Sequence, residues 1–232
     1  MGNINSNSPK IGLKDLKNVL KDNNDVNKQN KFGETILHQV IETKDVTEEI
    51  LEYMLENKCD PNIKIENQGM TPFHLLIKKQ QSVENLEKMV PIMLKYKADP
   101  NLKYFCGISA FQIESMKTNP SYHVLSNLLE SRADPNFKFD GRVALHAFAN
   151  NNLPLKFFEL LISFKADVMS LDNHNTSTLN HYLNNSNFKT DVVGFLLECK
   201  SDMNTIDKLE RGAFNYTLML NSKQKKKKNL FN

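Results

Sequence analysis

The chain repeats one hydrophobic pattern about every 35 residues. In each copy a short apolar stretch follows a polar turn. A second stretch, after a polar loop, carries apolar residues at positions i, i+1, i+4 and i+5. The second stretches cover residues 50–55, 89–94, 124–129, 157–162 and 192–197. This spacing is typical of a helix with one apolar face and not of a strand. The pattern therefore predicts pairs of short helices, each of which must pack against a neighbour.

The turns between the helix pairs recur at a nearly constant distance. An aspartate follows each second helix, at Asp25, Asp60, Asp99, Asp134, Asp167 and Asp202, with spacings of 35, 39, 35, 33 and 35 residues. A turn glycine recurs at Gly33, Gly69, Gly107 and Gly141, and Asn175 and Glu210 hold its place in the next two copies. A period of roughly 20 to 50 residues indicates a repeat protein, in which stacked units close one continuous core.

The most complete copy of the repeat begins with Gly69-Met70-Thr71-Pro72-Phe73-His74. Gly69 suits a turn because glycine takes positive φ at little cost. Thr71 can cap the following helix with its hydroxyl. Pro72 suits the first helical position, where its missing N–H would have no partner in any case. The stretch therefore predicts a tight turn followed at once by a helix.

This stretch resembles the Thr-Pro-Leu-His start of an ankyrin repeat, and the period of the chain fits that family. Partial matches are Gly33-Glu34-Thr35-Ile36-Leu37-His38 and Gly141-Arg142-Val143-Ala144-Leu145-His146. The resemblance implies an all-α fold, an ankyrin-repeat solenoid of stacked helix-turn-helix units joined by short hairpin-like loops. We expect about five full repeats with partial end repeats over residues 10–220, between disordered segments at 1–9 and 221–232.

The chain departs from the family where ankyrin repeats usually place a left-handed glycine after the second helix. That place is held by Lys58, Lys97, Arg132, Lys165 and Lys200, with Asn23 in the first partial repeat. A side chain there costs up to ~1 kcal/mol relative to glycine. Its positive charge regains ~0.3–1 kcal/mol at the carboxyl end of the helix. We therefore expect a solenoid less stable than one closer to the family pattern.

A second departure lies in the copy with the 39-residue spacing. Pro91 falls in its second helix and is expected to shorten or kink that helix. Residues 78–87 are predicted to form the longest loop between two helices, which would accommodate the additional residues.

Composition limits the possible functions without naming one. Of the 232 residues, 40 % are hydrophobic and 25 % are charged, which is enough to bury a core. The net charge of +3 comes mostly from residues 223–228 and is too small to imply nucleic-acid binding. The cysteines Cys59, Cys106 and Cys199 are odd in number and far apart, which favours a reducing compartment over disulfides or a zinc site. No apolar run approaches the ~18–20 residues of a membrane span, and no secretory signal begins the chain.

Residues that could carry chemistry recur with the repeat and do not converge. His38, His74 and His146 are spaced along the solenoid, and the family resemblance implies that they bond between neighbouring repeats. The recurring Asp-Pro-Asn segments are expected to make turn hydrogen bonds, because a calcium loop needs several ligands within one short segment. Phosphate-binding and nucleophile-elbow motifs are absent. We therefore expect no catalytic residue, no metal site and no cofactor.

Partner binding is the positive prediction, because solenoids present the turn tips and first helices on one concave face. Aromatic residues near the tips suit interaction hot spots. The candidate partner-binding residues are Phe32, Glu34, Gln68, Met70, Lys78, Lys79, Phe105, Ile108, Phe139, Arg142 and His174.

The two ends of the chain suggest a membrane alternative. Met1-Gly2-Asn3-Ile4-Asn5-Ser6 fits the pattern for myristoylation of Gly2. Lys225, Lys226, Lys227 and Lys228 could provide a second, electrostatic attachment to an anionic membrane surface, a nuclear import signal, or a solvated tail. A myristoyl chain alone anchors a protein only marginally, so the two features would act together.

The sequence thus predicts a cytoplasmic, non-catalytic adaptor or scaffold that binds a protein partner and no nucleic acid. Two alternatives stay open. One is a myristoylated, polybasic regulator associated with the membrane. The other is the targeting subunit of a regulatory enzyme, with catalysis on a partner chain.

Overall fold

The structure is a computed structural model that describes residues 16–18, 20, 25–43, 46–79, 82–104, 107–216 and 218. The expectations for residues 1–9 and 221–232, and those for Gly2 and for the lysines from Lys225 to Lys228, lie outside the described residues and stay predictions. Among the described residues no helix is long and apolar enough to cross a membrane.

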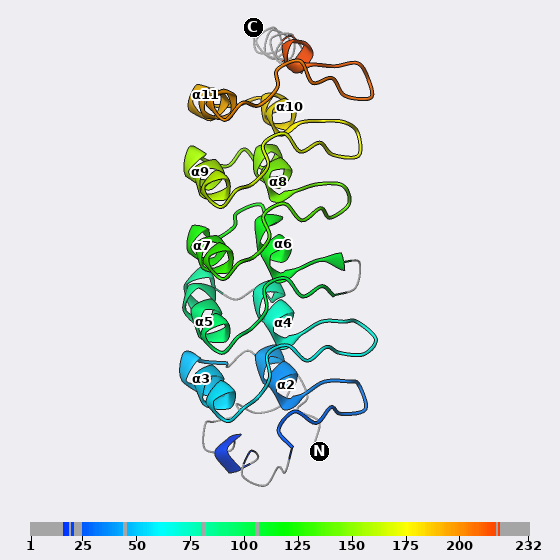
Figure 1. Cartoon of the computed structure of the whole chain (residues 1–232). Coiled ribbons are helices and arrows are strands. Elements are labelled where there is room, and N and C mark those ends of the chain that lie inside the picture. Colours follow the sequence, from blue (N-terminus) through cyan, green and yellow to red (C-terminus); the bar gives the residue numbers. More distant parts are fainter. Residues whose placement is uncertain are drawn as a thin grey trace, which may run out of the picture. The chain divides into compact units, whose positions relative to one another are not determined.

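The described chain forms short helices in pairs, as the hydrophobic pattern predicts (Figure 1). The helices are α2 (Ile36–Glu42), α3 (Glu48–Glu56), α4 (Pro72–Lys78), α5 (Val83–Lys95), α6 (Ala110–Ser115), α7 (Tyr122–Glu130), α8 (Ala144–Asn150), α9 (Leu155–Ser163), α10 (Thr178–Leu183) and α11 (Thr190–Glu198). A tip with two antiparallel arms precedes the first helix of each pair, and isolated β-bridges close three of these tips. The predicted all-α repeat fold is therefore confirmed.

The helices belong to two compact units. The first unit comprises residues 1–114 and 120–133, and in it α2 packs on α4, α3 on α5, and α5 on α7. The second unit comprises residues 115–119 and 134–232, and in it α8 packs on α10 and α9 on α11. Within each unit, first helices therefore pack on first helices and second helices on second helices. Leu51, Met54, Leu128 and Phe158 are among the side chains that this packing buries completely.

The first helices are held at their amino ends by the predicted caps. Thr71 Oγ1 accepts a hydrogen bond from the His74 amide, and Thr35 does the same for His38. In return, His74 Nδ1 accepts from the Thr71 amide at 3.2 Å. Pro72 occupies the first helical position, where no N–H is needed. The motif in the sequence therefore fixes where each of these helices begins.

The recurring histidines bond to the next repeat, as the resemblance implied. Their Nε2 atoms lie 3.3 Å from the Met70 carbonyl for His38, 2.8 Å from the Leu102 carbonyl for His74 and 2.9 Å from the Ser170 carbonyl for His146. Burial lowers the pKa of each of these three histidines to about 4. Each ring is therefore neutral near pH 7, with Nε2 donating and Nδ1 accepting.

The Asp-Pro-Asn segments make the predicted turn bonds and a further set between repeats. Asp60 Oδ1 accepts from the Asn62 amide at 2.8 Å within its own turn. The Asn62 side chain then donates to the Lys97 carbonyl at 2.9 Å and accepts from the Asp99 amide at 2.8 Å. The same pair of bonds joins Asn27 to Lys58 and Asp60, and Asn136 to Lys165 and Asp167. Asn101 donates in the same way to the Arg132 carbonyl. We call this series the asparagine ladder.

The asparagine ladder is interrupted in the second unit. Met169 stands where the other repeats have Asn, and its thioether replaces the amide that would face Lys200 and Asp202. The copy after this gap is also less covered by its neighbours. Phe214 is 72 % exposed, whereas Leu179, at the same position one repeat earlier, is 1 % exposed. The last copy therefore lacks the ladder bonds that join the earlier copies, and its Phe214 is exposed.

The basic residues after the second helices adopt the predicted left-handed conformation. Lys58, Lys97, Arg132, Lys165 and Lys200 have φ between 64° and 67°. Asn23 lies outside the described residues. The turn positions also have positive φ, both at the four glycines and at their substitutes Asn175 and Glu210. The chain thus keeps the backbone geometry of the repeat where it lacks the glycine.

The prediction that Pro91 shortens its helix is wrong. Helix α5 runs through Pro91 and has 13 residues, whereas α3, α7, α9 and α11 have 9 each. The loop expected over residues 78–87 is correspondingly short, because α4 ends at Lys78 and α5 begins at Val83. The additional residues of this repeat therefore lengthen its second helix by about one turn. The polar residues at the start of α5 have the composition of a loop but are helical.

Replacing a left-handed basic residue by glycine should stabilise the protein. Lys97→Gly and Arg132→Gly each remove a strained Cβ and leave intact the carbonyl that the ladder bonds. We expect a gain of up to ~1 kcal/mol and a rise in melting temperature of a few degrees. Lys97→Ala keeps the Cβ and is the control. Thermal melts in which both glycine variants fall below wild type would contradict the strain argument.

Restoring the missing ladder position should also stabilise the protein. Met169→Asn supplies an amide facing the Lys200 carbonyl and the Asp202 amide, so we expect a gain of about 1 kcal/mol in urea unfolding. Met203→Asn is the matched control, because Met203 is 56 % exposed and stands one place before the ladder position of its own turn. Equal midpoints for the two variants would show that the added hydrogen bonds are not formed.

Acidification should destabilise the protein through its buried histidines. The pKa of His74 is about 4 in the folded chain against 6.5 for an ordinary histidine, so the unfolded chain binds more protons between these values. Stability is therefore retained above pH 6.5 and falls as the pH drops toward 4. His74→Gln introduces the residue type that Gln112 provides at the same position of the next repeat. The variant should reduce the fall in unfolding free energy by on the order of 1 kcal/mol per pH unit. Urea unfolding midpoints measured from pH 7.5 to 4.5 give this slope. His123→Gln is the control, because His123 is exposed. An unchanged slope in His74→Gln would show that the buried His74 does not cause the loss of stability at low pH.

Candidate functional site

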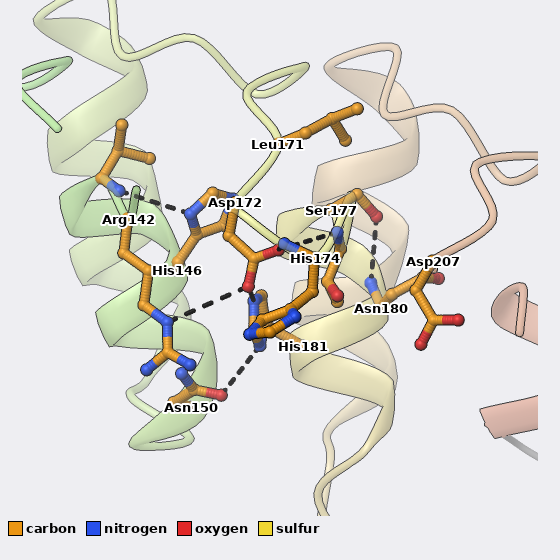
Figure 2. A network of polar contacts seen from close by, with 12 residues as sticks. Arg142, His146, Asn150, Leu171, Asp172, His174, Ser177, Asn180, His181 and Asp207 are labelled. Carbon is orange, nitrogen blue, oxygen red and sulfur yellow. Dashed lines mark hydrogen bonds and ion pairs between the residues drawn. The ribbon is translucent and has the colours of Figure 1, made fainter. Parts of the chain in front are cut away.

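A pocket of about 460 Å³ lies on the tip side of the second unit. Three successive tips and the face of α10 contribute its walls. The lining residues are Arg142, Asp172, His174, Thr176, Asn180, His181, Asn184, Asp207, Lys208, Leu209, Arg211 and Tyr216. Figure 2 shows the part of this polar network around Asp172. The pocket is the candidate functional site, because tips and first helices form the expected binding face.

Asp172 shapes the middle tip by accepting backbone hydrogen bonds. Its Oδ1 accepts from the amides of His174 at 2.8 Å and Thr176 at 2.9 Å. Its Oδ2 accepts from His181 Nε2 at 2.9 Å and lies 3.9 Å from Arg142 Nε. Burial acts to raise the pKa of the Asp172 carboxyl, but these hydrogen bonds outweigh it and lower the pKa. The side chain is 2 % exposed, so its negative charge is buried and paired.

Asp207 plays the same part in the last tip, 35 residues further on. Its Oδ1 accepts from the amides of Leu209 at 2.8 Å and Arg211 at 2.9 Å. Its Oδ2 accepts from Arg211 Nη2 at 2.6 Å and from the Tyr216 hydroxyl at 2.7 Å. Against the effect of burial, these bonds hold the pKa of Asp207 far below its ordinary value. Burial, followed by the bond to Asp207, raises the pKa of Tyr216 to about 12.

Neighbouring tips in this unit pack closely. A Cβ on Gly141 would lie 2.2 Å from Cγ and Oδ1 of Asn173 on the next tip. The Lys208 amide donates to the His174 carbonyl at 2.9 Å, which joins the last two tips. The pocket residues are therefore carried on a connected set of loops.

His181 is held from both sides and has no nitrogen left for a substrate. Nε2 donates to Asp172, and Nδ1 lies 3.0 Å from the atom placed as Asn150 Oδ1 (Figure 2). Burial, which outweighs the attraction of Asp172, lowers the pKa of His181. The neutral ring then accepts at Nδ1, and the Asn150 amide can supply the donor with its nitrogen turned toward the ring. The pair His181–Asp172 therefore orders the tip and does not form a base with a free lone pair.

The accessible charges of the pocket are positive. The side chain of Arg142 is 48 % exposed and that of Arg211 is 33 % exposed. Lys208 and His174 are exposed as well, and within the described part of the chain their side chains have no hydrogen-bond or ion-pair partner. The carboxylates of Asp172 and Asp207 are buried, and each accepts several hydrogen bonds from the protein. An incoming ligand therefore meets cationic and donor groups first.

Two kinds of chemical group, a metal-ligand cluster and the Cys59 thiol, are not found in the pocket as the structure describes it. No three His, Cys, Asp or Glu side chains in the described ranges are grouped as a metal site would need. Cys59 is buried, and burial raises the pKa of its thiol to about 12, so the thiol stays protonated. The arrangement is suited to recognising a ligand.

The structure brings together two of the predicted partner-binding residues, Arg142 and His174, in this pocket. Phe139, predicted with them, is half-buried, and its backbone bridges to Arg142 across the base of the tip.

In the first unit the predicted residues are placed singly. Phe32, Gln68 and Lys78 are exposed at their tips or helix ends, and Phe32 is 52 % exposed. Glu34 and Ile108 are half-buried, and Phe105 lies outside the described residues.

Two predicted contact residues have structural roles instead. Met70 is 4 % exposed and its carbonyl receives the bond from His38, so its side chain is not presented at the tip. Lys79 Nζ donates to the carbonyls of Ile41 and Thr43, both at 2.7 Å, and thereby caps the end of α2. The prediction that these two side chains face a partner is therefore corrected. Met70 faces inward because alternate residues of a tip do so, and Lys79 reaches back to the end of a neighbouring helix.

Most pocket residues were not singled out from the sequence, notably Asp172, His181, Asp207, Lys208 and Arg211. The sequence did contain a feature that could have pointed to this pocket. Asp172 and Asp207 each stand three residues before the substituted turn positions Asn175 and Glu210. In the other tips this place is held by Asn30, Glu66, Tyr104 and Lys138. An aspartate at this place therefore distinguishes the last two tips.

Known proteins show the same repeat. Residues 10–104 match the family model for ankyrin repeats (3 copies). A protein of Rickettsia felis (strain ATCC VR-1525 / URRWXCal2), described as an ankyrin repeat protein, is 31 % identical over 114 residues. That match covers 48 % of this chain and 50 % of the relative, so it spans about half of the relative's length. The crystal structure of the ankyrin repeat domain of Bcl-3, a member of the IkappaB protein family, is 18 % identical with a TM-score of 0.65, over 87 % of this chain and 86 % of that one.

The family model thus identifies ankyrin repeats in residues 10–104, and the described chain has the all-α fold of an ankyrin-repeat domain. Ankyrin repeats generally serve as protein–protein interaction modules, and they typically lack enzymatic activity.

Proposed function

We propose that this protein is a non-catalytic recognition module that binds a segment of a partner protein across its turn tips and first helices. The observation that carries the proposal is the pocket of about 460 Å³ that three successive tips share with α10. Its volume lies within the range of roughly 300 to 1,000 Å³ of sites that bind ligands and side chains.

The build of the pocket supports recognition. Its loops are fixed from beneath by Asp172 and Asp207, so the residues above them need little ordering when a partner binds. Exposed Leu209, at 69 %, gives an apolar contact beside the cationic residues Arg142 and Lys208. An apolar contact surrounded by polar groups is the usual composition of a binding surface.

The proposal can be tested by selecting ligands for the purified full chain from a displayed library of random linear peptides. The pocket variant combines Arg142→Ala and Leu209→Ser. The control variant combines Glu159→Ala and Lys189→Ala, two exposed residues of the same unit that do not line the pocket. We expect selected peptides to bind the pocket variant at least about tenfold more weakly, a loss of about 1.4 kcal/mol or more, and the control unchanged. Failure to select any peptide, or equal binding to both variants, would contradict the proposal.

A further inference from the structure

We infer that the pocket in the second unit receives an acidic side chain, Asp or Glu, from an extended segment of the partner, with a neighbouring apolar residue against Leu209. This inference rests on the proposed function and adds the chemistry of the segment that is recognised. It follows from which charges of the pocket are accessible and which are already used.

The carboxylates of the pocket do not compete for a cation or repel an anion strongly. Asp207 is neutralised by Arg211, whose Nε and Nη2 both bond to it, and it also accepts from Tyr216. Asp172 is bonded by two amides and His181 and is nearly fully buried. The Asp207 charge is therefore neutralised by Arg211, whereas the buried Asp172 carboxylate is held by hydrogen bonds from neutral donors and lies 3.9 Å from Arg142.

The two cations that remain, Arg142 and Lys208, line the pocket. Arg142 has about half of its side chain exposed and only a long 3.9 Å contact to Asp172. The Lys208 side chain has no charged or hydrogen-bonding partner among the described residues. Charge-assisted bonds from Arg and Lys to a carboxylate are about twice as strong as bonds between neutral groups. An acidic side chain is therefore the group that these two residues suit best.

The net charge of the pocket favours a single negative charge over a phosphate group. Its lining holds the three cations Arg142, Lys208 and Arg211 and two carboxylates, which leaves one positive charge in excess. A carboxylate balances that excess, whereas a phosphoserine carries about −1.5 to −2 charges at pH 7. Because Arg211 is committed to Asp207, it is not available as a second clamp for a dianion.

An internal side chain fits better than a chain end. The lining comes from three consecutive tips, so the pocket extends along the direction in which the tips repeat. A segment lying across these tips continues past the pocket on both sides. Leu209, 69 % exposed on the last tip, then contacts the residue next to the acidic one.

The test uses three matched pools of synthetic peptides with amidated ends. Each pool has a fixed Leu followed by Glu, Gln or phosphoserine, and flanks randomised without acidic residues. Retention on the immobilised full chain is measured at low and high salt. We expect at least about tenfold more retention of the Glu pool than of the Gln pool, with the difference reduced at high salt. Arg142→Gln and Lys208→Gln should each remove most of the difference.

Lys189→Gln is the matched control, because Lys189 is an exposed lysine of the same unit outside the pocket. Thermal melts confirm that the variants fold. Lys208→Glu should in addition retain a Leu-Lys pool better than wild type does, a result that loss of folding cannot produce.

Equal retention of the Glu and Gln pools would overturn the inference, and so would preferred retention of the phosphoserine pool. Retention of none of the three pools would overturn it as well. The random-library selection is a separate experiment, so peptides selected there without an acidic residue would leave the proposed function standing while this inference falls.

Discussion

The structure depends on one bond pattern, in which the asparagines Asn27, Asn62, Asn101 and Asn136 of successive turns bond to the backbone of the next repeat. Asn62 takes both the Lys97 carbonyl and the Asp99 amide, and Asn27 and Asn136 do the same in their places. The paired carbonyl belongs to a residue with positive φ. Ladder bonds therefore support the strained positions of Lys58, Lys97, Arg132 and Lys165, whereas Lys200 keeps the same conformation at the place where the ladder asparagine is replaced by Met169. The buried histidines form a second set of hydrogen bonds from each repeat to a backbone carbonyl of the next.

The repeat fold could be predicted from the sequence because its determinants are local and periodic. Gly69, Thr71 and Pro72 indicate a turn, a cap and a first helical residue, and each takes that role. The left-handed lysines could be predicted in the same way, from position within the period. The prediction that Pro91 shortens its helix was wrong because proline penalises a helix without forbidding it. The apolar face of α5 buries Leu86, Met89, Val90 and Met93, and this packing outweighs the lost hydrogen bond.

The candidate site was predicted only in part, for a physical reason. Arg142 and His174 were found because tips are exposed in any such repeat. Asp172 and Asp207 were overlooked because a carboxylate in a turn is ordinarily a solvated surface group, and only the folded chain shows each one buried under several donors. Met70 and Lys79 were placed on the surface because the direction of a side chain within a tip, or the reach of a lysine to Ile41, depends on the neighbouring repeat.

The gap in the ladder at Met169 has a consequence for recognition. Asp207, Lys208, Leu209, Arg211 and Tyr216 belong to the copy that follows the gap, so part of the pocket is carried by a copy that lacks the ladder bonds to the one before it. A ligand of the proposed kind, in contact with both Arg142 and Lys208, would span that junction. By thermodynamic linkage its binding would stabilise the attachment of the whole last copy, while Asp172 and Asp207 keep the loop of each tip fixed. Under the proposed function, Met169 would therefore influence affinity although it does not line the pocket.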